Sequence, residues 1–276
     1  MKQCIVINDY SAFGSNSLAA ALPVLAAFGI KAHAFPTAVL SAQTEFENHA
    51  KTPVVLPPFF EQAASIIRGE VALVSGFLQE PCQAQQIKNY LLSRSETLYV
   101  LDPVLGDGGT FYQGFSHQNA EAILPLLPHA TVVTPNLTEA CLLTGSNYPL
   151  FLEECAKKGA SAALPLAVKL NGLGAKNVII TGIMQGKEIQ TLLVCEGTPY
   201  CFSQAAETTP RSGTGDLFAA LLTAFLLCGN PLPDATKRAA HYVAKALHVT
   251  ESEDGRLGTD FEKILPELTS FSPYAK

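Results

Sequence analysis

A turn late in the chain combines two glycines, two hydroxyl residues and a carboxylate. Arg211-Ser212-Gly213-Thr214-Gly215-Asp216 is followed at once by the apolar helical run LFAALLTAFLLC. The glycines let the backbone turn tightly, and the start of the following helix presents unpaired N–H groups to an anion. A carboxylate at such a site would repel a phosphate, so its presence suggests a specific role. One such role is to accept the proton of an attacking hydroxyl. The turn therefore predicts an anion site with Asp216 as a base.

A structural role for the same turn stays open. Ser212 or Thr214 could cap a core helix, with Asp216 complementing the helix dipole. A dinucleotide-binding loop is a poorer match, because it should follow the first strand and carry a third glycine. A Walker loop does not fit, because no G-K-[ST] follows the turn.

Two further turns carry carboxylates where strands are expected to end. The turn 102–109, Asp102-Pro103-Val104-Leu105-Gly106-Asp107-Gly108-Gly109, has a proline that stops the preceding strand. The turn Thr134-Pro135-Asn136-Leu137-Thr138-Glu139 places Asn136 and Glu139 at the spacing of a helix N-cap. Capping is thus the alternative for Asn136 and Glu139, and an ordinary acidic turn is the alternative for Asp102 and Asp107.

The elements between these turns must bring them together. Short apolar runs alternate with helical segments, which predicts a mostly parallel sheet with helices on both faces. The predicted strands are 4–7, 32–37, 71–75, 98–101, 130–134 and 177–181, and the predicted helices are 15–28, 58–68, 81–93, 116–126 and 160–173. Residues 189–195 and 199–202 flank Glu196-Gly197-Thr198 and predict a hairpin, which gives the sheet an antiparallel edge.

Ligands of such sheets collect at the carboxyl ends of the strands, where the three turns are expected to converge. A Mg²⁺ ion that bridges phosphates needs a few carboxylates and water molecules. One pocket would therefore explain all three turns.

Composition limits the class of protein. The 276 residues are 48% hydrophobic and show no repeat or linker, so we expect one α/β domain over residues 1–276. A formal charge of -6 without a dense Lys/Arg run argues against a nucleic-acid partner. Neither a secretory signal nor a bilayer-spanning stretch is evident, so we expect a cytoplasmic protein without a membrane partner. Seven scattered cysteines without a C-x-x-C pair predict free thiols.

The motifs resemble those of the ribokinase superfamily, which implies a ribokinase-like three-layer sandwich. The late G-T-G-D turn is similar to the anion hole of that superfamily, so the resemblance implies anion-hole roles for Gly213, Thr214 and Gly215, with Asp216 as the catalytic base. N-x-x-E, here Asn136 and Glu139, resembles its magnesium-ordering motif.

A narrower resemblance lies in residues 102–107. They are similar to the D-P-V-x-G-D of the pyridoxal kinases, whereas hydroxymethylpyrimidine kinases usually read D-P-V-M followed by something other than Gly-Asp. The resemblance runs from Ile5 to about Ala246. It implies ATP- and Mg²⁺-dependent phosphorylation of the 5′-hydroxymethyl group of pyridoxal, pyridoxine or pyridoxamine. It also implies a homodimer and, in many members, a monovalent cation such as K⁺.

The resemblance assigns further site residues by position. It implies a metal site at Asp102 and Glu139, and it implies ATP contacts at Asp107, Thr134, Asn136, Thr181 and Ser212. The implied substrate contacts are Asp9, Thr37 and Phe77.

Two of these residues depart from the family pattern. Asp9 stands where pyridoxal kinases commonly have a serine, and Phe77 stands where they have a tyrosine. An acid would pair better with a protonated ring nitrogen, while Phe keeps the stacking face and loses the phenolic donor. An Asx-type turn is an equal alternative for Asp9.

Two other functions stay open. One is a hydroxymethylpyrimidine kinase of thiamine synthesis, and the other is a catalytically silent nucleotide-binding protein of the same fold. The polar segment 43–57 has the length and composition of a lid over the site.

Overall fold

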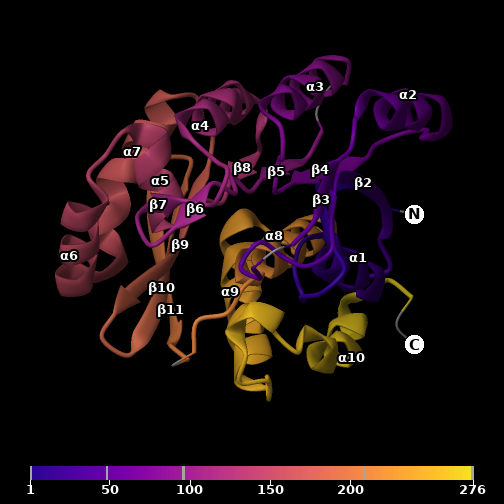
Figure 1. Ribbon diagram of the computed structural model, residues 1–276. Coiled ribbons are helices and arrows are strands. Elements are labelled where there is room, and N and C mark those ends of the chain that lie inside the picture. Colours follow the sequence, from indigo (N-terminus) through magenta and orange to yellow (C-terminus); the bar gives the residue numbers. More distant parts are fainter. Residues whose placement is uncertain (1, 48, 95–96, 208, 275–276) are drawn as a thin grey trace.

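Strands and helices alternate along most of the chain (Figure 1). The computed structural model describes residues 2–47, 49–94, 97–207 and 209–274. Its strands are β1 (Gln3–Ser11), β2 (Lys31–Leu40), β3 (Lys51–Pro53), β4 (Ala72–Ser75), β5 (Tyr99–Leu101), β6 (Gly106–Asp107), β7 (Thr110–Phe111), β8 (Val132–Val133), β9 (Val178–Gln185), β10 (Glu188–Cys195) and β11 (Thr198–Ala205). Its α-helices are α1 (Ser17–Ala27), α2 (Pro57–Ile66), α3 (Pro81–Leu92), α4 (His117–Ile123), α5 (Leu137–Thr144), α6 (Tyr148–Lys158), α7 (Leu164–Gly172), α8 (Thr214–Leu227), α9 (Leu232–His248) and α10 (Leu265–Leu268).

Within the described residues, nine strands form one sheet in the order β11-β10-β9-β8-β5-β4-β1-β2-β3. The neighbours from β9 to β2 are parallel, and β10 and β11 form an antiparallel hairpin beside β9. This arrangement confirms the predicted parallel sheet with an antiparallel edge. A second antiparallel edge was not predicted, because β3 pairs with β2 inside the segment expected to be a loop.

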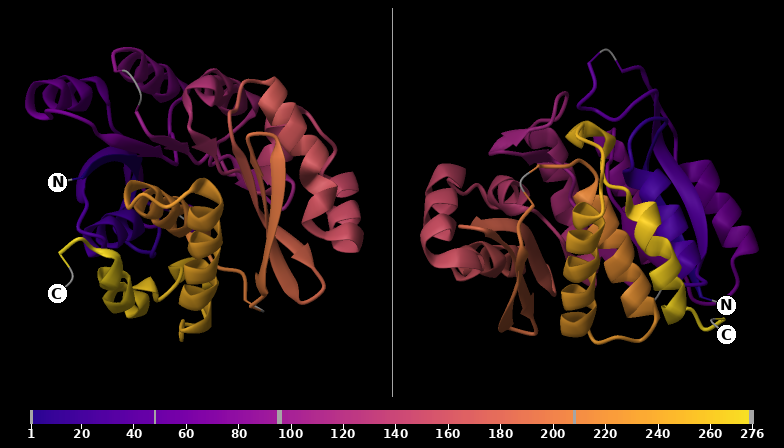
Figure 2. Two further views of the ribbon diagram at one scale, coloured as in Figure 1. Left: turned by 180° about the vertical axis from the view of Figure 1, so that it is seen from behind. Right: turned by 90° about the horizontal axis from the view of Figure 1, so that it is seen from below.

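The sheet separates two hydrophobic cores. Successive residues of a strand point to opposite faces, so Ile5 and Ile7 of β1 pack with α2 to α7 whereas Cys4 and Val6 pack with α1, α8, α9 and α10. Figure 2 shows these two groups of helices on opposite sides of the sheet. Burial on both faces explains why the strands read as continuous apolar runs. The predicted three-layer arrangement is confirmed.

The helices differ from the prediction in one region. Residues 159–163 form a 3₁₀ turn before α7, so the predicted helix 160–173 is divided. Helix α6, which precedes this turn, was not predicted. Its cap is Asn147, whose side chain accepts a hydrogen bond from the Leu150 N–H at 3.0 Å, and Pro149 lies in its first turn. An Asn followed by a Pro is a usual start signal for a helix.

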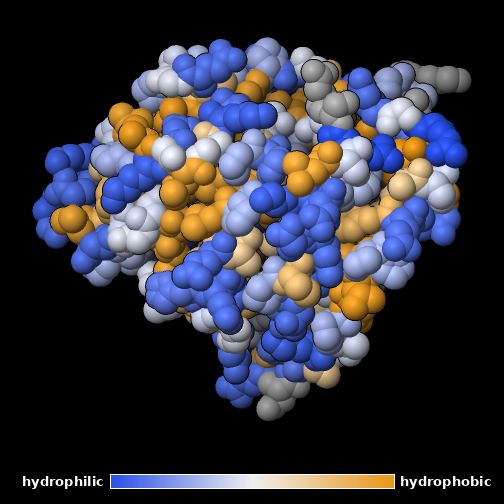
Figure 3. All heavy atoms as spheres, turned by 90° about the horizontal axis from the view of Figure 1, so that it is seen from above, coloured by the Kyte–Doolittle hydropathy of each residue, from blue (hydrophilic) through white to orange (hydrophobic). Residues whose placement is uncertain are grey.

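Hydrophilic residues cover most of the surface seen from above, and hydrophobic residues gather between them in small groups (Figure 3). In the part of the chain that the structure describes, no helix has both the length and the apolar character that a membrane span requires. All seven cysteines are free, as predicted.

Candidate active site

The carboxyl ends of five neighbouring strands meet at one rim of the sheet. Backbone hydrogen bonds of 2.9–3.0 Å continue from strand to strand there, from Gly76 N–H to Ile7 O, Asp102 N–H to Ser75 O, Thr134 N–H to Leu101 O, and Thr181 N–H to Pro135 O. Ile7 of β1, the turns that follow β4, β5 and β8, and Thr181 of β9 therefore lie along one line of the rim.

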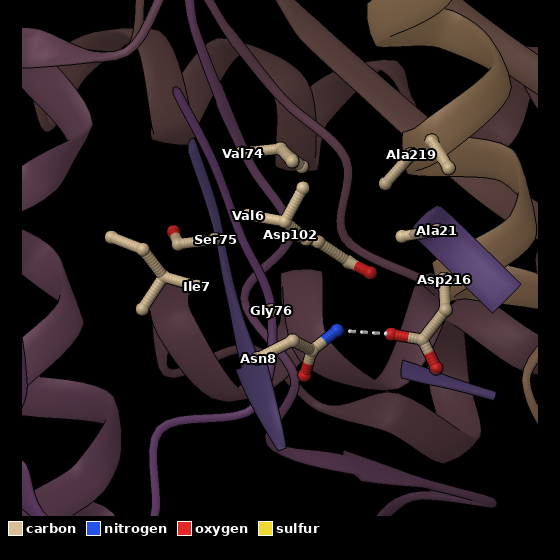
Figure 4. A pocket seen from close by; sticks show the side chains of 11 residues that line it. Val6, Ile7, Asn8, Ala21, Val74, Ser75, Gly76, Asp102, Asp216 and Ala219 are labelled. Atoms are coloured by element: carbon tan, nitrogen blue, oxygen red, sulfur yellow. Dashed lines mark hydrogen bonds between the residues drawn. The ribbon is translucent and has the colours of Figure 1, made fainter. Parts of the chain in front are cut away.

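Helix α8 begins at the same rim. Its N-cap residue is Gly213, which has a φ of 76°. A Cβ at this position would lie 2.6 Å from the backbone oxygen of Ser15, so only glycine allows both this conformation and this close approach. Asp216 lies in the first turn of α8, and together with Asp102 it lines the cavity of Figure 4. The first motif is therefore a helix start at the rim, as the sequence predicted.

Both carboxylate oxygens of Asp216 accept hydrogen bonds. The side-chain amide of Asn8 donates to Oδ1 at 2.7 Å (Figure 4), and the backbone N–H of Ser17 donates to Oδ2 at 2.9 Å. Burial raises the pKa of Asp216 to about 6, the charge of Asp9 adds to this rise, and the hydrogen bonds from Ser17 and Asn8 oppose it. A carboxylate with such a pKa is ionised at neutral pH and basic enough to accept a proton.

Two buried carboxylates lie beside the half-buried Asp216. Asp102 is 5% exposed and Glu139 is 3% exposed. Burial raises the pKa of Asp102, and the charges of Glu139 and Asp216 raise it further. Burial also raises the pKa of Glu139 to about 8, against the lowering effect of backbone hydrogen bonds. The central requirement of the sequence argument, that these three residues lie together, is met.

Within the described residues, this acidic cluster has no cationic partner. Among the ion pairs of the described residues, none includes Asp102, Glu139 or Asp216. Burial thus disfavours the charged forms of Asp102 and Glu139, and a hard divalent cation such as Mg²⁺ would stabilise those forms. Over residues 2–47, 49–94, 97–207 and 209–274, no group of three or more His, Cys, Asp or Glu could hold a metal ion by itself. Water and phosphate oxygens would have to complete the coordination, as is usual for Mg²⁺.

The capping alternative for Asn136 and Glu139 is confirmed. The Asn136 side chain accepts a hydrogen bond from the Glu139 N–H at 2.9 Å, and Glu139 Oε2 accepts one from the Asn136 N–H at 2.8 Å. Both side chains also hold the turn after β5, because Glu139 Oε1 accepts from the Leu105 N–H at 3.1 Å and Asn136 donates to Gly106 O at 2.9 Å. The second and third motifs are thus joined, while a role of Glu139 in metal binding stays a prediction.

The other residues predicted to contact ATP lie along the rim. Asp107 is exposed and accepts a hydrogen bond from the Gly108 N–H at 2.7 Å. Thr134 is buried, and its hydroxyl lies 3.4 Å from Asp102 Oδ1. Thr181 is half-buried and forms an isolated β-bridge with Asn136. Their contacts with ATP stay predictions.

Ser212 connects the anion-hole turn to the segment predicted as a lid. Its hydroxyl donates to the carboxylate of Glu45. In the same segment the Gln43 side chain donates to Arg256 O at 3.0 Å, and the Arg256 guanidinium lies 4.6 Å from the ring centroid of Phe46. The start of segment 43–57, from Gln43 to Phe46, thus packs beside the anion-hole turn and Arg256, and movement of the segment as a lid stays a prediction.

The residues predicted to contact the substrate are buried and paired internally. Asp9 accepts hydrogen bonds from the hydroxyls of Ser11 at 2.7 Å and Ser17 at 2.5 Å, which replace the Asx-type turn considered for it. Thr37 is 0% exposed and donates to Phe77 O at 2.7 Å, so its hydroxyl supports the turn after β4. The ring of Phe77 stacks on Phe115 with centroids 5.0 Å apart.

Three residues of the site were given no role from the sequence, although the resemblance to the pyridoxal kinases includes the segment from Asn8 to Ser17. Asn8 and Ser17 hold Asp216, although they lie about 200 positions away in the chain. Tyr112 is half-buried after the glycine-rich turn, and burial raises the pKa of its phenol, as do the charges of Glu139, Asp107, Asp102 and Asp216. Only their places in the chain could have suggested these residues. Asn8 ends the apolar run of β1, and Tyr112 follows the 102–109 turn.

Known proteins resemble the chain over nearly its whole length. The family described as phosphomethylpyrimidine kinase matches residues 14–260. A pyridoxine/pyridoxal/pyridoxamine kinase of Bordetella avium is 28% identical over 274 residues, which cover 93% of this chain and 86% of that protein.

Two solved structures share the fold. The pyridoxal kinase of Lactobacillus plantarum superposes with a TM-score of 0.87 at 29% identity, covering 98% of this chain and 97% of that one. A candidate phosphomethylpyrimidine kinase of Bacteroides thetaiotaomicron, crystallised with pyridoxal, gives a TM-score of 0.88 at 26% identity, covering 97% and 95%. The expected ribokinase-like fold is confirmed by this similarity.

Proposed function

The chain belongs to the phosphomethylpyrimidine kinase family, and from that premise we propose that it transfers the γ-phosphoryl group of ATP to the 5′-hydroxymethyl group of a B6 vitamer. Kinases of this family use ATP, normally with Mg²⁺. The observation that carries the proposal is the meeting of Asp216 with Asp102 and Glu139 at the start of α8. The names of the Bordetella avium and Lactobacillus plantarum relatives support a vitamer as the acceptor.

Asp216 is assigned the role of base. It accepts the proton of the substrate hydroxyl while the hydroxyl oxygen forms a bond to the γ-phosphorus. The bond from the γ-phosphorus to the β,γ-bridging oxygen breaks, and ADP leaves with the electron pair. The backbone N–H groups of Gly213, Thr214 and Gly215 face the transferring phosphoryl group and stabilise its charge.

Asp102 and Glu139 are assigned to the metal, with Asp107 at the edge of the cluster. Mg²⁺ bound there would neutralise charge on the phosphate oxygens of ATP. Thr134, Asn136, Thr181 and Ser212 are assigned to the nucleotide side of the rim. With these assignments, Asp102, Asp107, Glu139 and Asp216 would all contribute to the same reaction.

The substrate side is assigned to the last residues of β1 and to the turn after β4. Phe77 and Phe115 offer an apolar wall for an aromatic ring, and Thr37 holds the backbone of Phe77. Asp9 lies beneath Ser11 and Ser17, so its charge would reach a protonated ring nitrogen through these hydroxyls.

A second candidate function is phosphorylation of hydroxymethylpyrimidine, which the description of the matching family favours. Gly106-Asp107 in the 102–109 turn favours the vitamer, because it is the part that resembles the pyridoxal kinases. A catalytically silent nucleotide-binding protein is the third candidate, but such a protein would have no need for the base assigned to Asp216.

An ADP-release assay separates these functions. The enzyme is given Mg·ATP with pyridoxal, pyridoxine, pyridoxamine or hydroxymethylpyrimidine, and kcat/KM is compared. We expect the highest value for one of the three vitamers. A preference for the pyrimidine would support the second function instead, and ATP binding without turnover on any of the four would support the third.

The same proposal extends to the whole protein. We assign residues 1–276 to one kinase domain that works in the cytoplasm as a homodimer, with K⁺ as an activator. Light scattering after size exclusion tests the dimer, and turnover in matched K⁺ and Na⁺ buffers tests the cation. A monomer, or equal rates in the two buffers, would refute the corresponding part.

A further inference from the structure

Asn8 joins three elements of the rim. The side chain is 5% exposed, and its Oδ1 accepts hydrogen bonds from the Asp9 N–H at 3.0 Å and the Phe77 N–H at 2.8 Å. Because two backbone donors occupy the oxygen, the amide nitrogen must point the other way. There it donates to Asp216 Oδ1 at 2.7 Å (Figure 4).

Ser17 holds the other oxygen of the same carboxylate. Its backbone N–H donates to Asp216 Oδ2 at 2.9 Å, and its hydroxyl donates to Asp9. Ser17 has a φ of 50°, a left-handed conformation that is unfavourable for a residue with a side chain. Such conformations persist only where the surroundings enforce them, and they cluster at functional sites.

Two glycines make room for this arrangement. A Cβ on Gly76 would lie 2.5 Å from Asn8 Nδ2, and a Cβ on Gly213 would lie 2.6 Å from Ser15 O. Because Gly76 has no side chain, the Asn8 amide can lie against the turn after β4. The close approach at Gly213 brings the start of α8 against the start of α1. Backbone shape and side-chain contacts therefore agree in fixing Asp216.

We propose that Asn8 and Ser17 are positioning residues for Asp216, each holding one carboxylate oxygen so that the free lone pairs face the cavity shared with Asp102. This inference rests on the proposed function, in which Asp216 takes the proton of the attacking hydroxyl. A base that rotates freely meets that proton less often in a reactive geometry, so the two donors act on turnover rather than on nucleotide binding.

Asn8→Asp replaces the amide donor with a second carboxyl group beside Asp216 and keeps the oxygen that accepts from Asp9 and Phe77. We expect kcat to fall about 10- to 100-fold, or about 1.4–2.7 kcal/mol, with KM for ATP changed less than about threefold. Asn230→Asp is the matched control. Asn230 follows α8 at its far end and donates to Phe225 O at 2.9 Å, so this variant loses a comparable donor away from the site and should keep wild-type kcat and KM. A kcat within about twofold of wild type in folded Asn8→Asp overturns the proposal.

A second variant covers the case in which Asn8→Asp does not fold. Asn8→Ser is uncharged and too short to reach Asp216, and we expect the same loss of kcat with KM for ATP retained. Equal kcat in folded Asn8→Ser and wild type would overturn the proposal in the same way.

A double-mutant cycle, measured by thermal stability, tests this inference separately from the proposed function. Tm is measured for Asn8→Asp, for Asp216→Asn and for the double variant, in which the amide and the carboxylate exchange places and can pair again. We expect Asn8→Asp to lower Tm and the second substitution to restore it, without restoring turnover. Additive Tm changes would show that the pair is not coupled and would overturn the inference whether or not the wild type is active. No turnover by the wild type on any tested alcohol, with the Tm coupling present, would refute the proposed function alone.

Discussion

Burying a carboxylate without a cation is unfavourable unless hydrogen-bond donors hold it. The acidic cluster combines the buried Asp102 and Glu139 with the half-buried Asp216, and each is held differently. Asp216 has one side-chain and one backbone donor, Glu139 has the backbone N–H groups of Leu105 and Asn136, and Asp102 has the weak contact with Thr134. Asp216 is therefore the best-held side chain that also faces the cavity, which suits a base.

The raised pKa of Asp216 predicts an acid limb in the pH profile of the reaction. A base acts in its deprotonated form, and the pKa is raised from 3.8 to about 6. As pH falls through about 6, Asp216 gains a proton and kcat/KM should fall about tenfold per pH unit. The measurement is kcat/KM for a vitamer between about pH 5 and pH 8. A flat profile down to about pH 5 would contradict the assignment of Asp216 as the base.

Among the elements, the start of α8 depends on Gly213. We expect Gly213→Ala to lower the free energy of unfolding by about 2 kcal/mol or more and to raise KM for ATP, because the added Cβ meets Ser15 O and the positive φ becomes strained. Gly229→Ala, just beyond the other end of α8, is the matched control. Gly229 has a φ of 87°, and no heavy atom lies within 4 Å of a Cβ built there. Gly229→Ala is therefore destabilised only by the strained φ, and its KM for ATP should not change. Equal effects of the two variants on KM would contradict the proposed anion site.

The start of α5 gives a second prediction at this scale. We expect Glu139→Gln to raise the Mg²⁺ concentration for half-maximal activity about tenfold, because one carboxylate of the cluster is lost. Helix α4 offers a control for the loss of a cap alone, since Ser116 and Asn119 form a capping box without a carboxylate. Asn119→Ala should lower Tm without changing the Mg²⁺ requirement. If Glu139→Gln folds and needs no more Mg²⁺ than wild type, Glu139 is a helix cap only.

The sequence was informative about elements where residue type alone limits the backbone. Pro103 and Pro135 end strands, Gly213 needs a left-handed φ, and Asn136 with Glu139 has the spacing of a cap, so the turns were predicted in the right places. The apolar runs of β1 and β4 identify strands buried on both faces. Strand β3 was missed because Lys51–Pro53 is short and exposed, and only its pairing with β2 makes it a strand.

For the whole molecule, the site exists only through the topology of the sheet. Parallel crossovers place β1, β4, β5 and β8 side by side, so Asn8 of β1 and the turns from residues 76, 102 and 134 meet at one rim with α8. The sequence predicted this meeting from the rule that ligands lie at carboxyl strand ends. It did not predict the bond of Asn8 to Asp216, because a contact across 208 positions leaves no local pattern. The left-handed φ of Ser17 is equally absent from the sequence, since serine rarely adopts it.

The most direct test of the account is turnover by Asp216→Asn compared with its affinity for ATP. Asn is close to Asp in size and cannot accept the proton, so we expect kcat to fall about 10²- to 10⁴-fold. We expect the dissociation constant for Mg·ATP, measured by calorimetry, to stay close to that of the wild type. Near-wild-type turnover in a folded variant that still binds ATP would contradict the claim that Asp216 at this rim is the base.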